Sequence, residues 1–240
     1  MKQLAMSTTK NVINGQKMIQ YLLNRPKTEM VGLGLIYGQP GLGKSRFAKQ
    51  QAIMNDYVYL RLEATMTAKS FSVRLLEVLR YHLGITKTPI WGSTNEIFNK
   101  ILDILRHYDN LVIIIDEIDY AFDRKRILGS IRDIVDETLS VVVLVGMGDA
   151  REKLLMADAH YFDRCNYFCE FQEVTEEDIR LLCQEVPDVR IDDKIVKFLK
   201  KVTKGNLRKL MKALYSIETT SKAYNISEFT IEQLKLIEIS

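Results

Sequence analysis

The sequence predicts an α/β protein: a five-stranded, mostly parallel sheet with flanking helices, followed by a small C-terminal all-helical domain. Over the first 173 residues, short apolar or β-branched segments alternate with amphipathic helical segments, the pattern of a parallel sheet with helical crossovers. One segment, 111–115, is continuously apolar, as in a strand buried on both faces. From about residue 175 onward the spacing indicates only helices. We therefore expect two domains, 1–173 and 174–240.

Composition excludes several classes of protein. Of the 240 residues, 47% are hydrophobic and 27% are charged, which is ordinary for a soluble globular protein. No apolar run approaches membrane length and the first 30 residues lack a signal-peptide core, so we expect a cytoplasmic protein with no membrane partner. The three cysteines contain no C-x-x-C pair, which favours reduced thiols over a zinc site. The net charge of +3 is too small to identify a nucleic-acid partner by itself.

The periodicity places each element. Apolar residues at helical spacing mark the helices, and β-branched runs mark the strands. Thr65 or Thr67 is the expected cap of the helix with an apolar stripe over 71–83, and Ser93 or Thr94 caps the next one. The expected core elements are helix 11–23, strand 33–37, helix 45–54, strand 57–62, a helix with its apolar stripe over 71–83, a helix with its apolar stripe over 97–105, strand 111–115, helix 127–135, strand 141–145 and strand 168–171. The expected C-terminal helices are 175–186, 192–203, 206–223 and 230–238, with Pro187 and Gly205 as breaks.

The strongest motif lies between the first strand and the next helix. Residues 38–45 fit G-x-x-x-x-G-K-[ST] at every fixed position, a loop whose backbone N–H groups surround a phosphate. Lys44 would reach the β and γ phosphates, and Ser45 would complete the shell of Mg2+. A glycine-rich turn without a ligand is the alternative, and the strand–loop–helix context argues against it. The expected nucleotide contacts are Gly38, Gln39, Pro40, Gly41, Leu42, Gly43, Lys44, Ser45 and Arg46.

A second chemical element follows the apolar run 111–115, which ends in Asp116 and Glu117. Ligands of open parallel sheets bind outside the carboxyl ends of the strands, so both acids are expected opposite the phosphate loop. Asp116 suits the magnesium shell, together with Ser45, and Glu117 suits polarisation of the attacking water. A strand that merely ends in a solvated acidic turn is the alternative.

With Arg164 before the last strand and Gly205-Asn206-Leu207-Arg208 in the helical region, this set of motifs resembles that of the AAA+ ATPases, P-loop NTPases with a helical lid. The resemblance covers nearly the whole chain. It implies ATP and Mg2+ as cofactors, ATP hydrolysis to ADP and phosphate, and a homo-oligomeric ring or helical filament with nucleotide at subunit interfaces.

The resemblance assigns roles to two arginines. Arg164 matches the arginine finger that reaches a neighbour's γ-phosphate, and Arg208 matches the lid arginine that contacts the nucleotide of its own subunit. Taken alone, each arginine would be a surface residue. Where the family usually has a small polar sensor residue, this chain has Gly146 and Met147, and Asp149 is the nearest polar group.

Within the superfamily, Ile131-Arg132-Asp133-Ile134-Val135-Asp136 followed by Val143-Leu144-Val145-Gly146-Met147 is similar to the transposition ATPases typified by the B protein of phage Mu. The transposon regulator TnsC is a more distant relative. The resemblance implies an ATP-dependent ATPase that assembles on DNA, selects transposition targets and activates a transposase. The alternatives are an AAA+ ATPase of another circuit, such as a helicase loader or a defence switch, and a nucleotide-gated scaffold that hardly hydrolyses ATP.

Charge distribution is consistent with a DNA partner. The segment 194–212 carries eight basic residues and no acid, and such a run can neutralise phosphates without reading sequence. A solvated helical face is an equally good explanation. No base-reading module is recognisable, so any contact with double-stranded DNA is expected to be non-specific. The candidate DNA contacts in this segment are Lys197, Lys201 and Lys204. The resemblance adds Lys69, Arg74 and Lys87, because relatives that form filaments line their central channel with loops between the second strand and the Asp-Glu strand.

Overall fold

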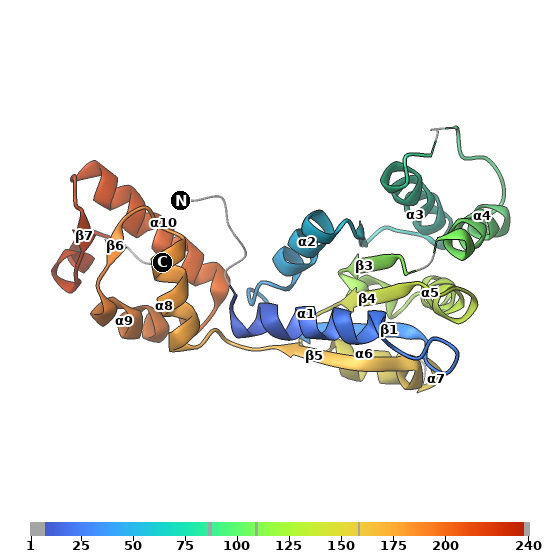
Figure 1. Cartoon of the computed structure of the whole chain (residues 1–240), viewed down its shortest axis with the longest axis horizontal. Coiled ribbons are helices and arrows are strands. Elements are labelled where there is room, and N and C mark those ends of the chain that lie inside the picture. The colour runs from blue at the N-terminus through green and yellow to red at the C-terminus, as the bar shows by residue number, and fades with distance from the viewer. Residues whose placement is uncertain (1–7, 86–87, 109, 158, 238–240) are drawn as a thin grey trace. The chain divides into compact units, whose positions relative to one another are not determined.

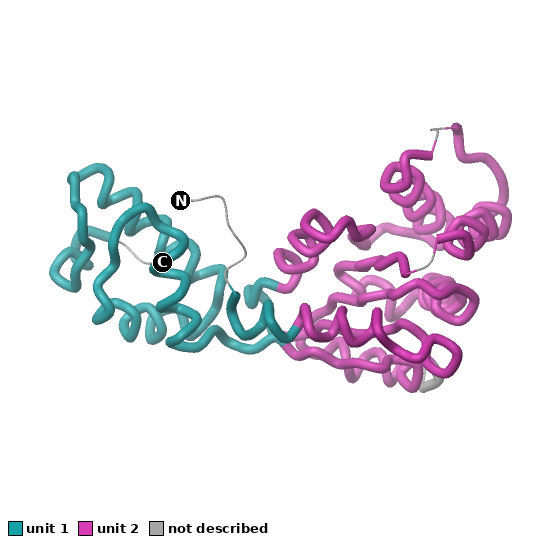
Figure 2. Tube along the Cα trace, viewed as in Figure 1, with its two compact units in different colours: residues 1–14, 39–43, 171–240 teal, residues 15–38, 44–170 magenta. Residues whose placement is uncertain are grey.

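We describe a computed structural model of the chain, which covers residues 8–85, 88–108, 110–157 and 159–237. The chain divides into two compact units, shown in different colours in Figure 2. The sheet unit contains residues 15–38 and 44–170. The lid unit contains residues 1–14, 39–43 and 171–240. The predicted boundary between residues 173 and 174 stays a prediction.

The sheet unit is built on a five-stranded sheet of order β2-β3-β4-β1-β5 (Figure 1). The pairs β2–β3, β3–β4 and β4–β1 are parallel, so β4 lies between the strand before the phosphate loop and the strand that ends in Asp116. All five residues of β3 and of β4 are buried, as continuous apolar runs predict for central parallel strands. The strands are β1 (Gly32–Gly38), β2 (Val58–Arg61), β3 (Val112–Asp116), β4 (Val141–Val145) and β5 (Cys165–Phe171).

Helices cover this sheet and bury the predicted apolar stripes. Thr67 and Ser93 cap α3 and α4 with reciprocal side-chain hydrogen bonds. Each is one of the two cap residues predicted for its helix. Gly34 lets α1 pack closely on β1: a Cβ there would displace the side-chain ends of Met18 and Leu22. The helices are α1 (Lys10–Leu23), α2 (Lys44–Asn55), α3 (Ala68–His82), α4 (Thr94–His107), the 3-10 helix η1 (Ile118–Ala121), α5 (Lys125–Glu137), α6 (Ala150–Ala157) and α7 (Ala159–Arg164).

The predicted fold class is confirmed, with local differences in the sheet unit. The fifth strand begins at Cys165 rather than at residue 168, and the sequence did not predict α6 and α7. Only Ala150 and Leu154 are buried in α6, so its apolar stripe is too short to show helical periodicity.

The lid unit has its own core, formed by α8 (Glu176–Glu185), α9 (Asp193–Thr203) and α10 (Leu207–Ala223). It also contains the 3-10 helix η2 (Ile231–Leu236) and a parallel pair of two-residue strands, β6 (Arg190–Ile191) and β7 (Glu228–Phe229), where only helices were expected. Two residues cannot show an alternating pattern, so these strands leave no signal in the sequence. Within the described ranges, no helix combines the length and apolarity needed to cross a membrane.

Candidate nucleotide-binding site

The phosphate-loop motif connects β1 to α2, as its spacing predicted. Gly38, Gly41 and Gly43 all have positive φ angles, of 148°, 86° and 94°. Residues other than glycine rarely adopt these backbone conformations. The loop leads directly into the N-terminus of α2 at Lys44. Such a loop can turn several N–H groups toward one anion, and the helix dipole favours negative charge at the same point.

Lys44 is buried, with 8% of its surface exposed. Its Nζ donates a hydrogen bond of 2.6 Å to the carbonyl oxygen of Gly38. The ammonium group is therefore held against the first residue of the loop that it would serve. Arg46, two positions further along α2, is partly buried, and this burial lowers the pKa of its guanidinium.

Three donors surround the buried carboxylate of Asp116. Ser45 Oγ donates to Oδ1 at 3.2 Å, and the backbone N–H of Glu117 donates to the same oxygen at 3.0 Å. The hydroxyl of Tyr59 donates to Oδ2 at 2.7 Å. Burial, and secondly this hydrogen bond, raise the pKa of Tyr59 well above its usual range, so the hydroxyl remains a donor near neutral pH.

The oxygens of Ser45 and Asp116 are of the type that Mg2+ prefers. Over the part of the chain that the structure describes, no group of three or more His, Cys, Asp or Glu side chains could hold a metal ion by itself. A magnesium ion beside Ser45 and Asp116 would therefore take its other ligands from water and phosphate. The residues present fit such an ion.

Glu117 follows Asp116 in the left-handed conformation, with φ 60° and ψ 44°. Its Oε1 lies 3.2 Å from Nη2 of Arg61 at the end of β2. About a quarter of the Glu117 side chain is exposed, at 24%, against 57% for Arg61. The carboxylate expected to polarise water is thus engaged by a cation.

The end of β4 carries no polar sensor side chain. A Cβ at Gly146 would collide with Ala150 and Ile118, so this position is closed to larger residues. The backbone N–H of Met147 instead donates to Asp119 Oδ2 at 2.8 Å. Asp149, the nearest polar residue in the sequence, pairs with Lys153 at 2.9 Å.

Arg208 lies in the first turn of α10 within the lid unit. Its backbone N–H donates to the carbonyl oxygen of Gly41 at 3.0 Å. Asn206, the N-cap of α10, donates through Nδ2 to the carbonyl oxygen of Pro40 at 3.0 Å, while its Oδ1 accepts from Lys209 N. The start of α10 therefore contacts loop residues directly. The contact of the Arg208 guanidinium with nucleotide stays a prediction.

Arg164 is the last residue of α7 and directly precedes β5, as the resemblance implied. Its Nε donates to both carboxylate oxygens of Asp136, at 2.8 and 3.0 Å. About a third of its side chain is exposed, at 35%. Any role at a neighbouring subunit would require this ion pair to open.

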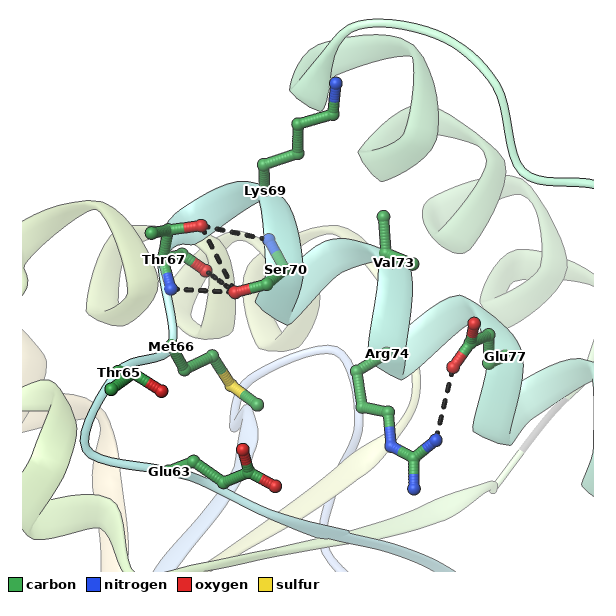
Figure 3. Close-up of a pocket in the computed structure, with 9 residues that line it drawn as sticks. All are labelled: Glu63, Thr65, Met66, Thr67, Lys69, Ser70, Val73, Arg74 and Glu77. Carbon is green, nitrogen blue, oxygen red and sulfur yellow. Dashed lines mark hydrogen bonds and ion pairs between the residues drawn. The ribbon is translucent and has the colours of Figure 1, made fainter.

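The candidate DNA contacts lie in both units. Lys69 and Arg74 line a cavity of about 540 Å³ on α3, whose lining includes neither Ser45 nor Asp116. Figure 3 shows Lys69 extending away from the other lining residues, and Arg74 turned to Glu77, with which it forms an ion pair of 3.2 Å. Lys197, Lys201 and Lys204 are exposed on the lid unit. Lys87 lies outside the described residues.

Sequence reasoning missed three residues near the strand ends of the sheet unit: Tyr59, Arg61 and Asp119. In the lid unit it assigned no role to Asn206, although this residue lies in the motif Gly205-Asn206-Leu207-Arg208. For Tyr59 and Arg61 a signal existed, since polar residues at alternate positions of a strand share one face. Asp119 accepts one hydrogen bond from the backbone of Met147, and Asn206 bonds two backbone atoms, one of Pro40 and one of Lys209. No spacing pattern reports such contacts.

The fold is also found in known proteins. The chain is similar to the ORC2 protein of Aeropyrum pernix in its ADPNP–ADP complexes, with a TM-score of 0.68 and 12% identity over 92% of this chain and 65% of that one. For the ORC1 protein of A. pernix in complex with DNA, the TM-score is 0.65 and the identity 17%, over 95% of this chain and 64% of that one. For a mutant form of Thermotoga maritima RuvB, the TM-score is 0.62 and the identity 15%, over 94% of this chain and 68% of that one.

At these identities the similarity is one of fold alone, and the chain spans slightly less than two thirds of the ORC proteins. No curated protein sequence matches the chain. None of these similarities singles out the Mu B or TnsC type. The family model described as "AAA domain" matches residues 29–154, more than half of the chain and including β1, the phosphate loop and β3. On this match, the protein belongs to the AAA domain family.

Proposed function

We propose that the protein is a magnesium-dependent ATPase that assembles on duplex DNA. The observation that carries the proposal is the cluster of Ser45, Asp116 and Glu117, in which a phosphate-loop hydroxyl lies 3.2 Å from the acid at the end of β3. The family match includes both motifs. A chain that only bound nucleotide would not need the second acid, Glu117.

In the proposed mechanism, backbone N–H groups of the loop bind the phosphates and Lys44 neutralises their charge. Bound Mg2+ would neutralise charge that develops on the β and γ phosphates. Ser45 and Asp116 would hold the ion. Glu117 would accept a hydrogen bond from the attacking water, in competition with Arg61 at Oε1. Arg208 would contact the nucleotide of its own subunit.

Assembly would complete the site. Arg164 would leave Asp136 and reach the γ-phosphate of a neighbouring subunit, where a planar cation stabilises the charge of the transition state. This role predicts a ring or a helical filament with nucleotide at each interface.

DNA binding is supported by the exposed lysines of α9 and its C-terminal end, namely Lys197, Lys201 and Lys204. It is also supported by the similarity in fold to an ORC1 protein whose structure was solved with DNA. Contacts of this kind neutralise phosphates and carry no sequence information, so binding should weaken steeply with salt. Lys69 and Arg74 on α3 are the second candidate surface.

The narrower form of the proposal is a transposition helper that selects target DNA and activates a transposase. It is supported by the resemblance of residues 131–136 and 143–147 to the Mu B type. A helicase loader, a defence switch and a weakly hydrolysing scaffold are the alternatives. A transposase gene next to the gene for this protein would favour the helper, and replication or defence genes there would favour another circuit.

The test is retention of duplex DNA by the purified protein at low salt, with ATP, with ADP and without nucleotide. We expect retention with ATP only, loss between about 50 and 200 mM salt, and no retention by Lys44→Ala. The matched control is Lys17→Ala, a lysine of α1 outside every candidate site. Equal retention with and without ATP, or none at low salt, would contradict the proposal.

A further inference from the structure

We propose that Tyr59 is a positioning residue for the magnesium site: its hydroxyl fixes the orientation of the Asp116 carboxylate beside Ser45. The inference rests on the proposed function, since it concerns the ion that ATP would bring. It assigns a role to a residue that lies outside the sequence motifs of the site.

The sheet register places Tyr59 within reach of Asp116. Tyr59 is the register partner of Ile114, and Arg61 is the register partner of Asp116. Alternate residues of a strand share a face, so Tyr59 and Arg61 point to the same side of β2. A tyrosine two positions along a neighbouring strand is long enough to reach a diagonal partner. Here its hydroxyl ends 2.7 Å from Asp116 Oδ2.

The two carboxylate oxygens of Asp116 therefore have different hydrogen-bond donors. Oδ1 accepts from Ser45 Oγ and from the backbone N–H of Glu117. Oδ2 accepts from Tyr59. The torsion about the Cβ–Cγ bond of an aspartate is broad, and without the tyrosine the hydrogen bonds at Oδ1 alone would restrain the carboxylate. With donors on both oxygens, the Asp116 carboxylate is held in one orientation, with Oδ1 toward Ser45.

The tyrosine ring also has a neighbour on α2. Its environment is partly buried, and Nζ of Lys49 on α2 lies 5.9 Å from the ring centroid, within range of a cation–π contact. Tyr59 thus links α2, which carries Ser45, to β3, which carries Asp116. Groups that orient metal-binding residues in this way commonly change metal affinity by about 10- to 100-fold when they are removed.

Tyr59→Phe tests the inference, because it removes the hydroxyl and keeps the ring. ATP binding is measured by calorimetry at increasing Mg2+ and again in EDTA. We expect unchanged affinity for ATP in EDTA, and a Mg2+ concentration for half-maximal enhancement of binding that rises by about 10-fold. The control is Tyr57→Phe, which removes a hydroxyl from the residue directly before β2.

Thermal unfolding in EDTA, without nucleotide, shows whether the fold is intact in both variants. Equal Mg2+ dependence of the Tyr59→Phe variant and the unchanged protein would overturn the inference and leave the proposed function standing. Equal losses with and without Mg2+ would also overturn it, since they would indicate a general structural role. If the unchanged protein bound no ATP, the proposed function itself would fail.

Discussion

Arg61 Nη2 lies 3.2 Å from Glu117 Oε1, so the carboxylate expected to act as the base is paired with a cation from the neighbouring strand. Because Oε1 already accepts an N–H of Arg61, the attacking water must compete with the arginine for this oxygen. The pair is partly exposed, and exposed ion pairs contribute about 0.2–1 kcal/mol. The interaction can therefore restrain hydrolysis only modestly.

Arg61→Ala should accordingly raise basal ATP turnover, by up to about 5-fold. Arg61→Lys should retain part of the restraint, because it keeps the charge. The rate of steady-state ATP hydrolysis without DNA measures the effect. The control is Arg106→Ala, which removes an arginine that pairs with Glu137. A fall in turnover for Arg61→Ala would show that the arginine assists the reaction instead.

Arg164→Ala should leave ATP binding intact and reduce assembly-dependent turnover by about 10³-fold, the scale of arginine fingers that act between subunits. Mixing this variant with Glu117→Gln protein should restore part of the activity, since one interface then has both groups. Arg132→Ala, on α5 and paired with Asp133, is the control. Absence of rescue in the mixture would argue against a shared site.

Arg25→Met should destabilise the sheet unit by about 1–3 kcal/mol, the cost of removing the donor from buried hydrogen-bond acceptors. Arg25 is 6% exposed, and its guanidinium donates to the carbonyl oxygens of Met30, Leu22 and Leu139 at 2.9, 2.8 and 3.1 Å. Methionine would leave these acceptors without a donor.

Chemical denaturation followed by circular dichroism measures this loss. Arg190→Met is the control, because the Arg190 side chain is 81% exposed, and it should change stability by less than about 0.5 kcal/mol. A loss for Arg25→Met no larger than that of the control would contradict the structural role of Arg25.

The three cysteines should be unreactive in the folded protein. Burial raises the pKa of Cys165 and Cys183 to about 12 and that of Cys169 to about 11, so each remains a neutral thiol near neutral pH. Titration with a chromogenic disulfide should detect three thiols quickly in denaturant and slowly without it. Rapid reaction of the native protein would show that the cores around these residues open readily.

Much of the sheet could be predicted from the sequence because its central strands are buried on both faces. Val141–Val145 is β4 with the predicted bounds, and the apolar run before Asp116 is β3. Motif spacing likewise placed Lys44 and Ser45 at the start of a helix, since a loop between a strand and a helix is a local structure, and the end of an apolar run placed Asp116.

The remainder depends on pairing between distant segments. Tyr59 and Arg61 become part of the site only because β2 pairs with β3 in one register. The strands β6 and β7 are two residues each, so tertiary contacts rather than local preference decide them. The ion pair of Arg164 with Asp136 joins residues 28 positions apart, and no periodicity encodes it.

The most direct test of hydrolysis at this site is the ATP turnover of Glu117→Gln, measured with Mg2+ on a sample whose ATP affinity is determined in parallel, with Glu29→Gln as the control. We predict that turnover falls by about 100-fold or more, the usual contribution of a general base, while ATP remains bound with similar affinity. Turnover of the Glu117→Gln variant close to that of the unchanged protein would contradict the role of Glu117 and the proposed mechanism with it.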